Sequence, residues 1–408
     1  MIKIQTQNDL TMTNIKNFDY IIVGAGISGM SAAETISLAL PDSTILMINN
    51  EPGLPYKRTR INKSIAKGFE HDEFALKSSM WFDINNITLL QAEVTELNTG
   101  TKSIITTDQT YTYGKLLLAT GSRPRSTENE VWDRNMFHVR TASQVESILA
   151  SMQQAKHYLI IGGGAEGVET AEQLMKAGKQ VTLIDRNQHL MHHYLTQELS
   201  QHLRAVLIKN AISVINPASI KEIQYSQTFT VELTDRTIAA DAIISCIGHI
   251  PDKKLASTAG IGTNRGIKVD QWLQTDAPDV FAAGDVAEHP EGRITGLWHA
   301  AEYQGKVAAL NMMGQKTICE NRPYRFKTEV FGEFYFSGGT IDNTKHTIIR
   351  TIKKNTVREV ATIGNKITGI LSLNEAPCAK LFQQALMERW SNEQLETGIK
   401  KLHTEQNN

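Results

Sequence analysis

Cysteine is scarce in this sequence. The 408 residues include three cysteines, at positions 246, 319 and 378, and no two of them form a C-x-x-C pair. A disulfide framework or a cysteine-based zinc site needs such clusters, so both are excluded. We expect each cysteine to be a small buried hydrophobic residue. His189, His192 and His193 lie close together in the sequence, but they follow a predicted strand in a loop, and no metal site is predicted.

An excess of charge is also absent. Lys and Arg number 42 and Asp and Glu 43, for a net charge of −1, whereas nucleic-acid-binding proteins are usually basic. No apolar run approaches the roughly 20 residues of a membrane helix, and the polar N-terminus lacks the apolar stretch of a secretory signal. We expect a cytoplasmic protein with no membrane or nucleic-acid partner, and loosely held polar tails over 1–17 and from Ser391 onward.

The remaining composition is that of a folded protein. Hydrophobic residues make up 41% of the chain and glycine contributes 28 residues, which is typical of globular proteins. The length predicts two to three domains.

A strand, a glycine-rich turn and a helix occur in this order twice. The motif G-x-G-x-x-G stands at 24–29 after the apolar run 20–23, and again at 162–167 after the run 158–161. Helices are predicted over 27–40 and 166–177, and further strands over 44–48 and 180–184. In this context the first glycine permits a tight turn, the second lets a pyrophosphate approach, and the third lets the helix pack on the strand. Two such units predict two parallel-sheet nucleotide domains.

Other segments support this prediction. The apolar stretches 116–121 and 243–248 both end in glycine, with a proline three residues later. A further apolar strand ends in Gly284-Asp285, where the aspartate could accept a hydrogen bond from a ribityl hydroxyl, and a helix over 299–313 follows.

The acid after the second strand of each unit indicates which nucleotide fits. Asp185 follows the strand 180–184, and its carboxylate can bind an adenosine ribose and would repel a 2′-phosphate. This favours NADH over NADPH, although Arg186 beside it leaves NADPH open. After the second strand of the first repeat, the sequence does not distinguish between Asn50 and Glu51 as the ribose ligand.

The end of the chain has a different character. From Glu329 onward, aromatic and β-branched residues alternate with polar ones, and Gly364-Asn365 lies between two such runs as a hairpin turn. With a helix over 377–390, this predicts a C-terminal α+β domain.

These features resemble the FAD/NAD(P)-dependent pyridine nucleotide oxidoreductases, the glutathione-reductase-like superfamily. Within it, the sequence is most similar to the rubredoxin and ferredoxin reductase branch, near the flavoproteins of nitrite reductases. The resemblance rests on GAGISG at 24–29, LPYKRTRINK at 54–63, LLLATGSRPR at 116–125, GGGAEGVETA at 162–171, DVFAAGDVAE at 279–288 and LWHAAEYQGKVAALNMMG at 297–314.

The resemblance implies an α/β fold with two Rossmann-like domains, the FAD domain being split by the NAD domain, and a C-terminal α+β domain. The expected boundaries are 1–125 with 245–325 for FAD, 126–244 for NAD and 326–408 for the C-terminal domain.

The resemblance also implies roles by position. Lys63 and Glu169 are expected to be catalytic, as an ion pair near flavin N5. Contacts with FAD or the nicotinamide dinucleotide are expected from Gly24, Gly26, Ile27, Ser28, Gly29, Asn50, Glu51, Arg58, Lys63, Val94, Ala119, Thr120, Gly121, Arg123, Gly162, Gly164, Ala165, Glu166, Gly167, Asp185, Gly248, Gly284, Asp285 and Trp298.

Two departures from the branch stand out. Thr59-Arg60 replaces the Pro-Pro that the branch often has, and Ala165 stands where many relatives place an aromatic residue over the flavin. The second departure suggests an unblocked nicotinamide site.

The scarcity of cysteine also indicates the reaction. Disulfide reductases of this superfamily carry a redox thiol early in the chain, and residues 51–80 contain no cysteine. We therefore expect hydride from NADH to reach FAD and electrons to pass to an external acceptor, most simply a small acidic rubredoxin-like or ferredoxin-like protein. The basic run of Lys57, Arg58, Arg60, Lys63 and Lys67 could be its docking rim or a solvated face that also contacts FAD.

Three alternatives stay open: an NADH oxidase, a nitrite-reductase-type partner flavoprotein, and a redox sensor that binds FAD and NADH. The sequence leaves the oligomeric state open, a homodimer included.

Overall fold

The computed structural model describes residues 15–342 and 344–406. By its internal contacts the chain divides into two compact units. The first unit comprises the chain up to Lys57, His71–Ser122 and Pro251–Cys319. The second comprises Arg58–Glu70, Arg123–Ile250 and the chain from Glu320 onward. The short strands β7 (Ser122–Pro124) and β15 (His249–Pro251) lie where the chain passes from one unit to the other.

The first unit is built on a seven-stranded sheet in the order β3-β2-β1-β6-β5-β4, with β17 also pairing with β6. Its strands are β1 (Lys16–Val23), β2 (Ile45–Asn49), β3 (Ile87–Gln91), β4 (Val94–Asn98), β5 (Ser103–Thr106), β6 (Thr110–Leu118) and β17 (Val280–Ala282). β1, β2, β3, β6 and β17 run parallel. The residues 20–23 and 116–118 are apolar and buried at every position, as parallel strands with both faces covered must be.

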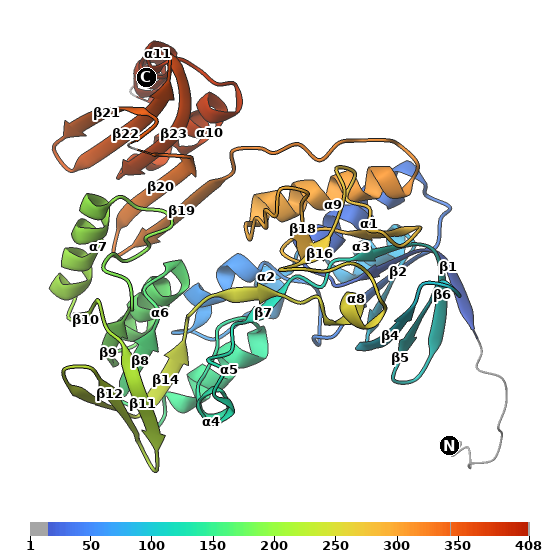
Figure 1. Cartoon of the computed structure of the whole chain (residues 1–408), viewed down its shortest axis with the longest axis horizontal. Coiled ribbons are helices and arrows are strands. Elements are labelled where there is room, and N and C mark those ends of the chain that lie inside the picture. Colours follow the sequence, from blue (N-terminus) through green and yellow to red (C-terminus); the bar gives the residue numbers. More distant parts are fainter. Residues whose placement is uncertain (1–14, 343, 407–408) are drawn as a thin grey trace. The chain divides into compact units, whose positions relative to one another are not determined.

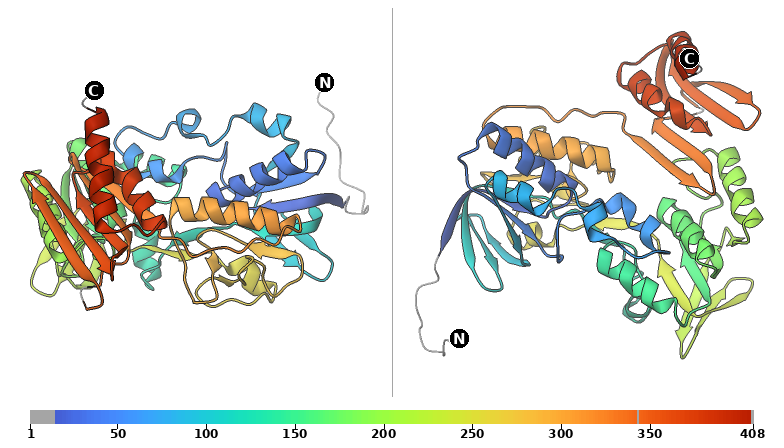
Figure 2. Two further views of the ribbon diagram at one scale, coloured as in Figure 1. Left: turned by 90° about the horizontal axis from the view of Figure 1, so that it is seen from above. Right: turned by 180° about the vertical axis from the view of Figure 1, so that it is seen from behind.

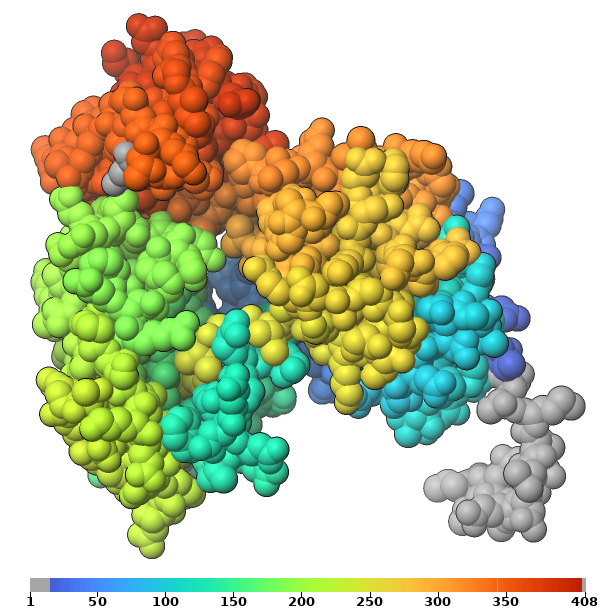
Figure 3. All heavy atoms as spheres, in the orientation of Figure 1, coloured from blue at the N-terminus to red at the C-terminus, as the bar shows by residue number. Residues whose placement is uncertain are grey.

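The first unit contains five helices among its described residues. They are α1 (Ile27–Ala39), α2 (His71–Phe74), α3 (Ser79–Ile84), α8 (Lys254–Thr258) and α9 (Trp298–Met312). Of these, α1, α3, α8 and α9 contact this sheet. α1 and α9 lie side by side (Figure 1), and both contribute to the large core of the unit. Figure 3 shows the surface of residues 251–319, yellow to orange, meeting that of β4 and β5 in cyan. A two-stranded sheet of β16 (Ile267–Lys268) and β18 (Ala287–Glu288) completes the unit.

The second unit contains a four-stranded parallel sheet in the order β10-β9-β8-β14. Its elements are α4 (Glu130–Asn135), α5 (Ala142–Ser151), β8 (His157–Ile161), α6 (Ala165–Lys176), β9 (Gln180–Ile184), α7 (Gln197–Lys209), β10 (Ser213–Ile215) and β14 (Ala242–Ser245). The meander β11 (Ile220–Tyr225), β12 (Phe229–Leu233) and β13 (Thr237–Ala240) packs on this sheet through a shared core. The predicted helices and strands after both glycine motifs are thus confirmed, with bounds shifted by a residue or so.

The C-terminal part of the second unit has a sheet of its own. This antiparallel sheet has the order β19-β20-β23-β22-β21, from β19 (Arg325–Val330), β20 (Glu333–Gly339), β21 (Thr347–Lys353), β22 (Thr356–Ile363) and β23 (Lys366–Leu373). The predicted hairpin turn at Gly364-Asn365 is confirmed, because Ile363 pairs with Lys366. The predicted helix is α10 (Ala379–Met387), preceded by the short 3₁₀ turn Ala376–Cys378.

The prediction of a loosely held C-terminal tail is wrong. Residues Asn392–Gln406 form helix α11, which lies beside α10 (Figure 2). Its residues are mostly polar, but Leu395 and Ile399 are spaced four apart on one face, and both are buried against Phe382 and its neighbours. Such spacing puts two apolar side chains on one side of a helix. The predicted N-terminal tail lies outside the described residues up to position 14, and β1 begins at Lys16.

Candidate functional site

In the first unit the predicted cofactor residues meet at the carboxyl ends of β1 and β6. β1 pairs with β2 on one side and β6 on the other, so the chain order reverses there, and α/β proteins bind ligands at such a point. Gly24 has a φ of +107°, and a Cβ at this position would lie 2.2 Å from the Ala119 carbonyl oxygen. Gly284 lies against Ser28, since a Cβ on it would be 3.1 Å from the Ser28 Cβ. Three segments distant in sequence therefore meet here.

The start of α1 fits the pyrophosphate of a dinucleotide. No side chain caps this helix end, and its first turn contains no acidic residue, so its amides and positive dipole end are available to an anion. A Cβ on Gly26 would find open space within 4 Å. The Ser28 hydroxyl is buried and has no hydrogen-bond partner among the described residues. The residues present fit FAD.

Several side chains hold the neighbouring turns. Ser122 Oγ donates to Asp285 at 3.1 Å, and Thr120 Oγ1 donates to the carbonyl of Asp252 at 2.7 Å. Gln304, fully buried on α9, accepts the backbone N–H of Gly284 at 2.8 Å. Gln304 was not predicted to have a role in the site, although it lies in the segment 297–314 that carries the family resemblance.

The other residues predicted to contact a cofactor lie on several further segments. Glu51 is partly buried and accepts a hydrogen bond from the Tyr56 hydroxyl at 2.5 Å, whereas Asn50 is exposed. The choice between the two as the ribose ligand stays open. Val94 begins β4 and Trp298 begins α9, both partly buried. Arg123, the first residue of the second unit after β6, is exposed.

The second unit repeats the arrangement between β8 and β14. Gly162 has a φ of +111°, and a Cβ there would lie 2.2 Å from the Cys246 carbonyl oxygen, next to the Gly248 turn. Asp185, at the end of β9, accepts the backbone N–H groups of Gly163 and Asn187. A Cβ on Gly164 would find open space. The residues of this turn fit a second dinucleotide, with the Asp185 carboxylate held beside it.

One residue gives the second motif a charge that the first motif lacks. Glu166 takes the motif position of Ser28 and stands in the first turn of α6. Its Oε2 lies 3.4 Å from Nε2 of His249, and the two side chains are 21% and 25% exposed. Burial raises the pKa of Glu166 to about 8 and lowers that of His249 to about 4. His249 was not predicted, although it follows the predicted Gly248.

The predicted catalytic pair is placed on α6 and on the segment Arg58–Glu70. Glu169 accepts hydrogen bonds from Asn62 Nδ2 at 3.2 Å and from Thr328 Oγ1 of β19. Burial raises the pKa of Glu169, while these two hydrogen bonds and the charge of Lys63 act in the opposite direction. Lys63 therefore acts on Glu169 through its charge, and the hydrogen-bonded neighbour is Asn62, which the sequence analysis missed. Their role as a catalytic ion pair stays a prediction.

The basic run is largely exposed. Lys57, Arg60, Lys63 and Lys67 are exposed, while Arg58 is partly buried and its guanidinium donates to the Arg140 carbonyl oxygen at 3.0 Å. Arg58 thereby ties this segment to the start of α5. His192 and His193 lie with ring centroids 3.9 Å apart.

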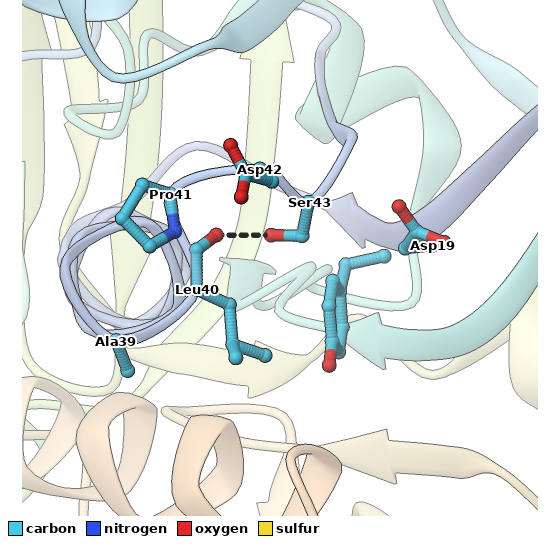
Figure 4. A pocket seen from close by; sticks show the side chains of 7 residues that line it. Asp19, Ala39, Leu40, Pro41, Asp42 and Ser43 are labelled. Atoms are coloured by element: carbon cyan, nitrogen blue, oxygen red, sulfur yellow. Dashed lines mark hydrogen bonds between the residues drawn. The ribbon is translucent and has the colours of Figure 1, made fainter.

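A pocket of about 430 Å³ lies in the first unit, away from the carboxyl ends of the strands where Gly24 stands. Figure 4 shows it between the end of α1 and the start of β1, with Ser43 Oγ donating to the Leu40 carbonyl oxygen at 2.8 Å. The Asp19 carboxylate in its wall accepts hydrogen bonds from Thr44. Because ligands of open α/β sheets bind at the carboxyl ends of strands, this pocket is not the cofactor site.

Comparison with known proteins agrees with this arrangement. The family model of the pyridine nucleotide-disulphide oxidoreductases matches residues 18–305. The chain belongs to this family. Membership in the pyridine nucleotide-disulphide oxidoreductases makes the protein an oxidoreductase and implies FAD and NAD(P)H as its cofactors.

Named relatives within this family include reductases of electron carriers. Rhodocoxin reductase of Rhodococcus erythropolis is 26% identical over 369 residues, 87% of this chain and 86% of the relative. NADH-rubredoxin oxidoreductase of Clostridium acetobutylicum is 27% identical, over 87% and 93%. Nitrite reductase [NAD(P)H] of Bacillus subtilis is 29% identical over 87% of this chain, which spans only 45% of that protein.

Solved structures of the family share the fold. The ferredoxin reductase for the CYP199A2 system of Rhodopseudomonas palustris matches with a TM-score of 0.84 at 23% identity, covering 91% of this chain and 95% of that one.

The family is named for disulphide chemistry, but the thiols of this chain are not placed for it. All three cysteines are buried, as predicted. Burial raises the pKa of Cys246 well above its usual range and that of Cys378 to about 11. Because the thiolate is the reactive form, these cysteines are not suited to exchange with a disulfide. Among residues 15–342 and 344–406, no helix is both long and apolar enough to cross a membrane.

Proposed function

We propose that this protein is an FAD-containing reductase that uses NADH to reduce a small, acidic electron-transfer protein of the rubredoxin or ferredoxin kind. The observation that supports this most is the absence of a reactive thiol from a pyridine nucleotide-disulphide oxidoreductase chain. Without a thiol relay, electrons leave for an acceptor outside the chain. Relatives named for rhodocoxin and rubredoxin reduction support an electron carrier as that acceptor.

The chain's own residues bind and orient the cofactors in this proposal. The amides at the start of α1 and the open face of Gly26 receive the FAD pyrophosphate. Asp285, held by Ser122, accepts from a ribityl hydroxyl. A bound FAD would supply the redox chemistry of this proposal, which is hydride acceptance from NADH and release of single electrons. Lys63 and Glu169 set the local charge of the second unit, because the charge of Lys63 acts on the Glu169 carboxyl group.

The choice of NADH rests on Asp185. Its carboxylate is fixed by two backbone N–H groups, so it cannot turn away from a 2′-phosphate, and like charges repel there. The purified protein is expected to be yellow, with one releasable FAD per chain, and to have a higher kcat/KM with NADH than with NADPH. A colourless protein that FAD cannot reconstitute would refute the proposal.

Carrier docking is assigned to the exposed cations of the second unit at Arg60 and Lys67. Electrostatic steering raises association rates and weakens with salt. We expect Arg60→Glu with Lys67→Glu to slow reduction of a rubredoxin several-fold and to flatten its salt dependence, while reduction of a neutral dye stays unchanged. The matched control is Lys209→Glu with Lys400→Glu, which reverses two exposed cations elsewhere in the same unit. If the reduction of dye and the reduction of rubredoxin slow equally, the basic run contributes to cofactor binding and not to carrier docking.

A second candidate function is that of a partner flavoprotein in nitrite or nitrate reduction. It is favoured by the Bacillus subtilis nitrite reductase and by the assimilatory nitrate reductase electron transfer subunit of the same organism, 29% identical over 72% of this chain. An NADH oxidase would consume oxygen without a carrier, and a redox sensor would stop after one reduction. Steady-state turnover with rubredoxin, ferredoxin, a nitrite reductase subunit, dye or oxygen as acceptor separates all four. The proposal includes a cytoplasmic location, where NADH is available, and a homodimer, which light scattering would test.

A further inference from the structure

The two dinucleotide motifs of this chain differ in charge at one position. The first turn of α1 contains no acid, as expected where a pyrophosphate binds. The first turn of α6 contains Glu166 at the matching position. A carboxylate there would lie close to the negative charges of the two phosphates of a bound dinucleotide.

The surroundings of Glu166 disfavour a charged carboxylate. The side chain lies between α6 and the turn that follows β14, in contact with His249 at 3.4 Å and hydrogen bonded with Cys246. The charged and titratable groups that face this pair are Arg140, Glu169 and His138. Arg140 favours the carboxylate of Glu166, but burial is the larger effect and Glu169 adds to it.

We propose that Glu166, in contact with His249, controls the affinity for the nicotinamide dinucleotide through its protonation: the neutral carboxyl admits the pyrophosphate, and the carboxylate repels it. This inference rests on the proposed function, because it assumes that the dinucleotide binds at the start of α6. Glu166 is thereby an affinity-determining residue of the site.

The consequence is a pH dependence of a definite sign. Because burial holds the pKa of Glu166 at about 8, its carboxyl group is mostly neutral at pH 7 and mostly charged at pH 9.5. A bound pyrophosphate disfavours the carboxylate further and raises this pKa, so binding near pH 8 must take up protons. His249, whose pKa is lowered to about 4 by burial and by Arg140, stays neutral over this range and does not supply a compensating charge.

The test is calorimetric titration of the FAD-loaded protein with NAD⁺ between pH 6.5 and 9.5. Two buffers of different ionisation enthalpy give the number of protons taken up. We expect Kd to weaken about ten-fold from pH 7 to pH 9.5, with proton uptake near pH 8. Glu166→Gln and Glu166→Ser, the second copying the residue of the first motif, should abolish both effects. Glu130→Gln removes an 85% exposed carboxylate of the same unit and should keep both.

Each outcome distinguishes the two proposals. NAD⁺ that fails to bind at any pH would overturn the proposed function. Tight binding that does not change with pH in the wild type, or a pH profile that survives in both Glu166 variants, would overturn the role of Glu166 and leave the proposed function intact. Circular dichroism confirms that each variant is folded.

Discussion

Asn62 Nδ2 donates a hydrogen bond to Glu169 Oε2 at 3.2 Å, although the two residues are 107 positions apart in the chain. The other carboxylate oxygen of Glu169 accepts from Thr328. Three segments, Arg58–Glu70, α6 and β19, therefore meet on one carboxylate. Two further contacts join α6 and its neighbours to the C-terminal sheet: the Phe331 N–H donates to Glu172 at 2.8 Å, and Tyr194 stacks on Phe326.

The first prediction concerns this carboxylate. Glu169→Ala leaves the Asn62 and Thr328 donors without their acceptor, so we expect a loss of about 1–3 kcal/mol in the free energy of unfolding and about ten-fold slower reduction of FAD by NADH. Glu169→Gln keeps an acceptor and should retain most of the stability. Urea titration and stopped-flow absorbance measure the two effects. Unchanged flavin reduction in a folded Glu169→Ala protein would limit the residue to a structural role.

The second prediction concerns the nucleotide choice. Asp185→Asn removes the negative charge but keeps an oxygen that can accept from Gly163 or Asn187. The preference for NADH over NADPH in kcat/KM should narrow about ten-fold, mainly through a better KM for NADPH. Steady-state kinetics with both nucleotides measures this ratio. A wild-type preference for NADPH would contradict the assigned role.

The third prediction concerns the thiols. Because Cys246, Cys319 and Cys378 are all buried, a thiol reagent such as DTNB should react slowly with the native protein and label three thiols after denaturation. Replacing all three with Ala should leave NADH-driven dye reduction largely intact, with a packing loss of about 1–2 kcal/mol for each. A folded, FAD-loaded triple variant without turnover would reveal thiol chemistry.

The fourth prediction is a pH dependence of stability in the first unit. Asp279 Oδ2 lies 2.6 Å from Lys102 Nζ, and Oδ1 pairs with Lys115. Hydrogen bonds from these lysines lower the pKa of Asp279 below its usual 3.8. A lowered pKa means that the stabilisation is complete above the unfolded value and is lost as the pH falls through the folded value.

Asp279→Asn should therefore destabilise the protein by about 1 kcal/mol at pH 7, a value reduced by the partial exposure of the side chain. Asn tolerates the positive φ of this position, so the backbone need not change. Thermal melts of variant and wild type should converge as the pH falls below the lowered pKa of Asp279 in the folded protein. A difference that persists there would indicate a packing effect.

The sequence by itself determined the two glycine turns and the sheets around them. Gly24 and Gly162 need a left-handed backbone and a close approach to a neighbouring strand, and these are local demands that only glycine meets. Strand and helix order followed from apolar runs next to such turns, and the C-terminal hairpin from Gly364-Asn365 in the same way.

Only the tertiary structure decided which side chains act together. The contacts of Glu169 with Asn62 and Thr328, and of Glu166 with His249, join residues distant in sequence, and no local pattern encodes them. Helix α11 looked like a polar tail because just a narrow apolar face, including Leu395 and Ile399, reaches the core. Steric demands of the backbone act within a few residues, so they can be recognised in the sequence. The burial and the pKa of a side chain depend on which distant residues the fold brings next to it.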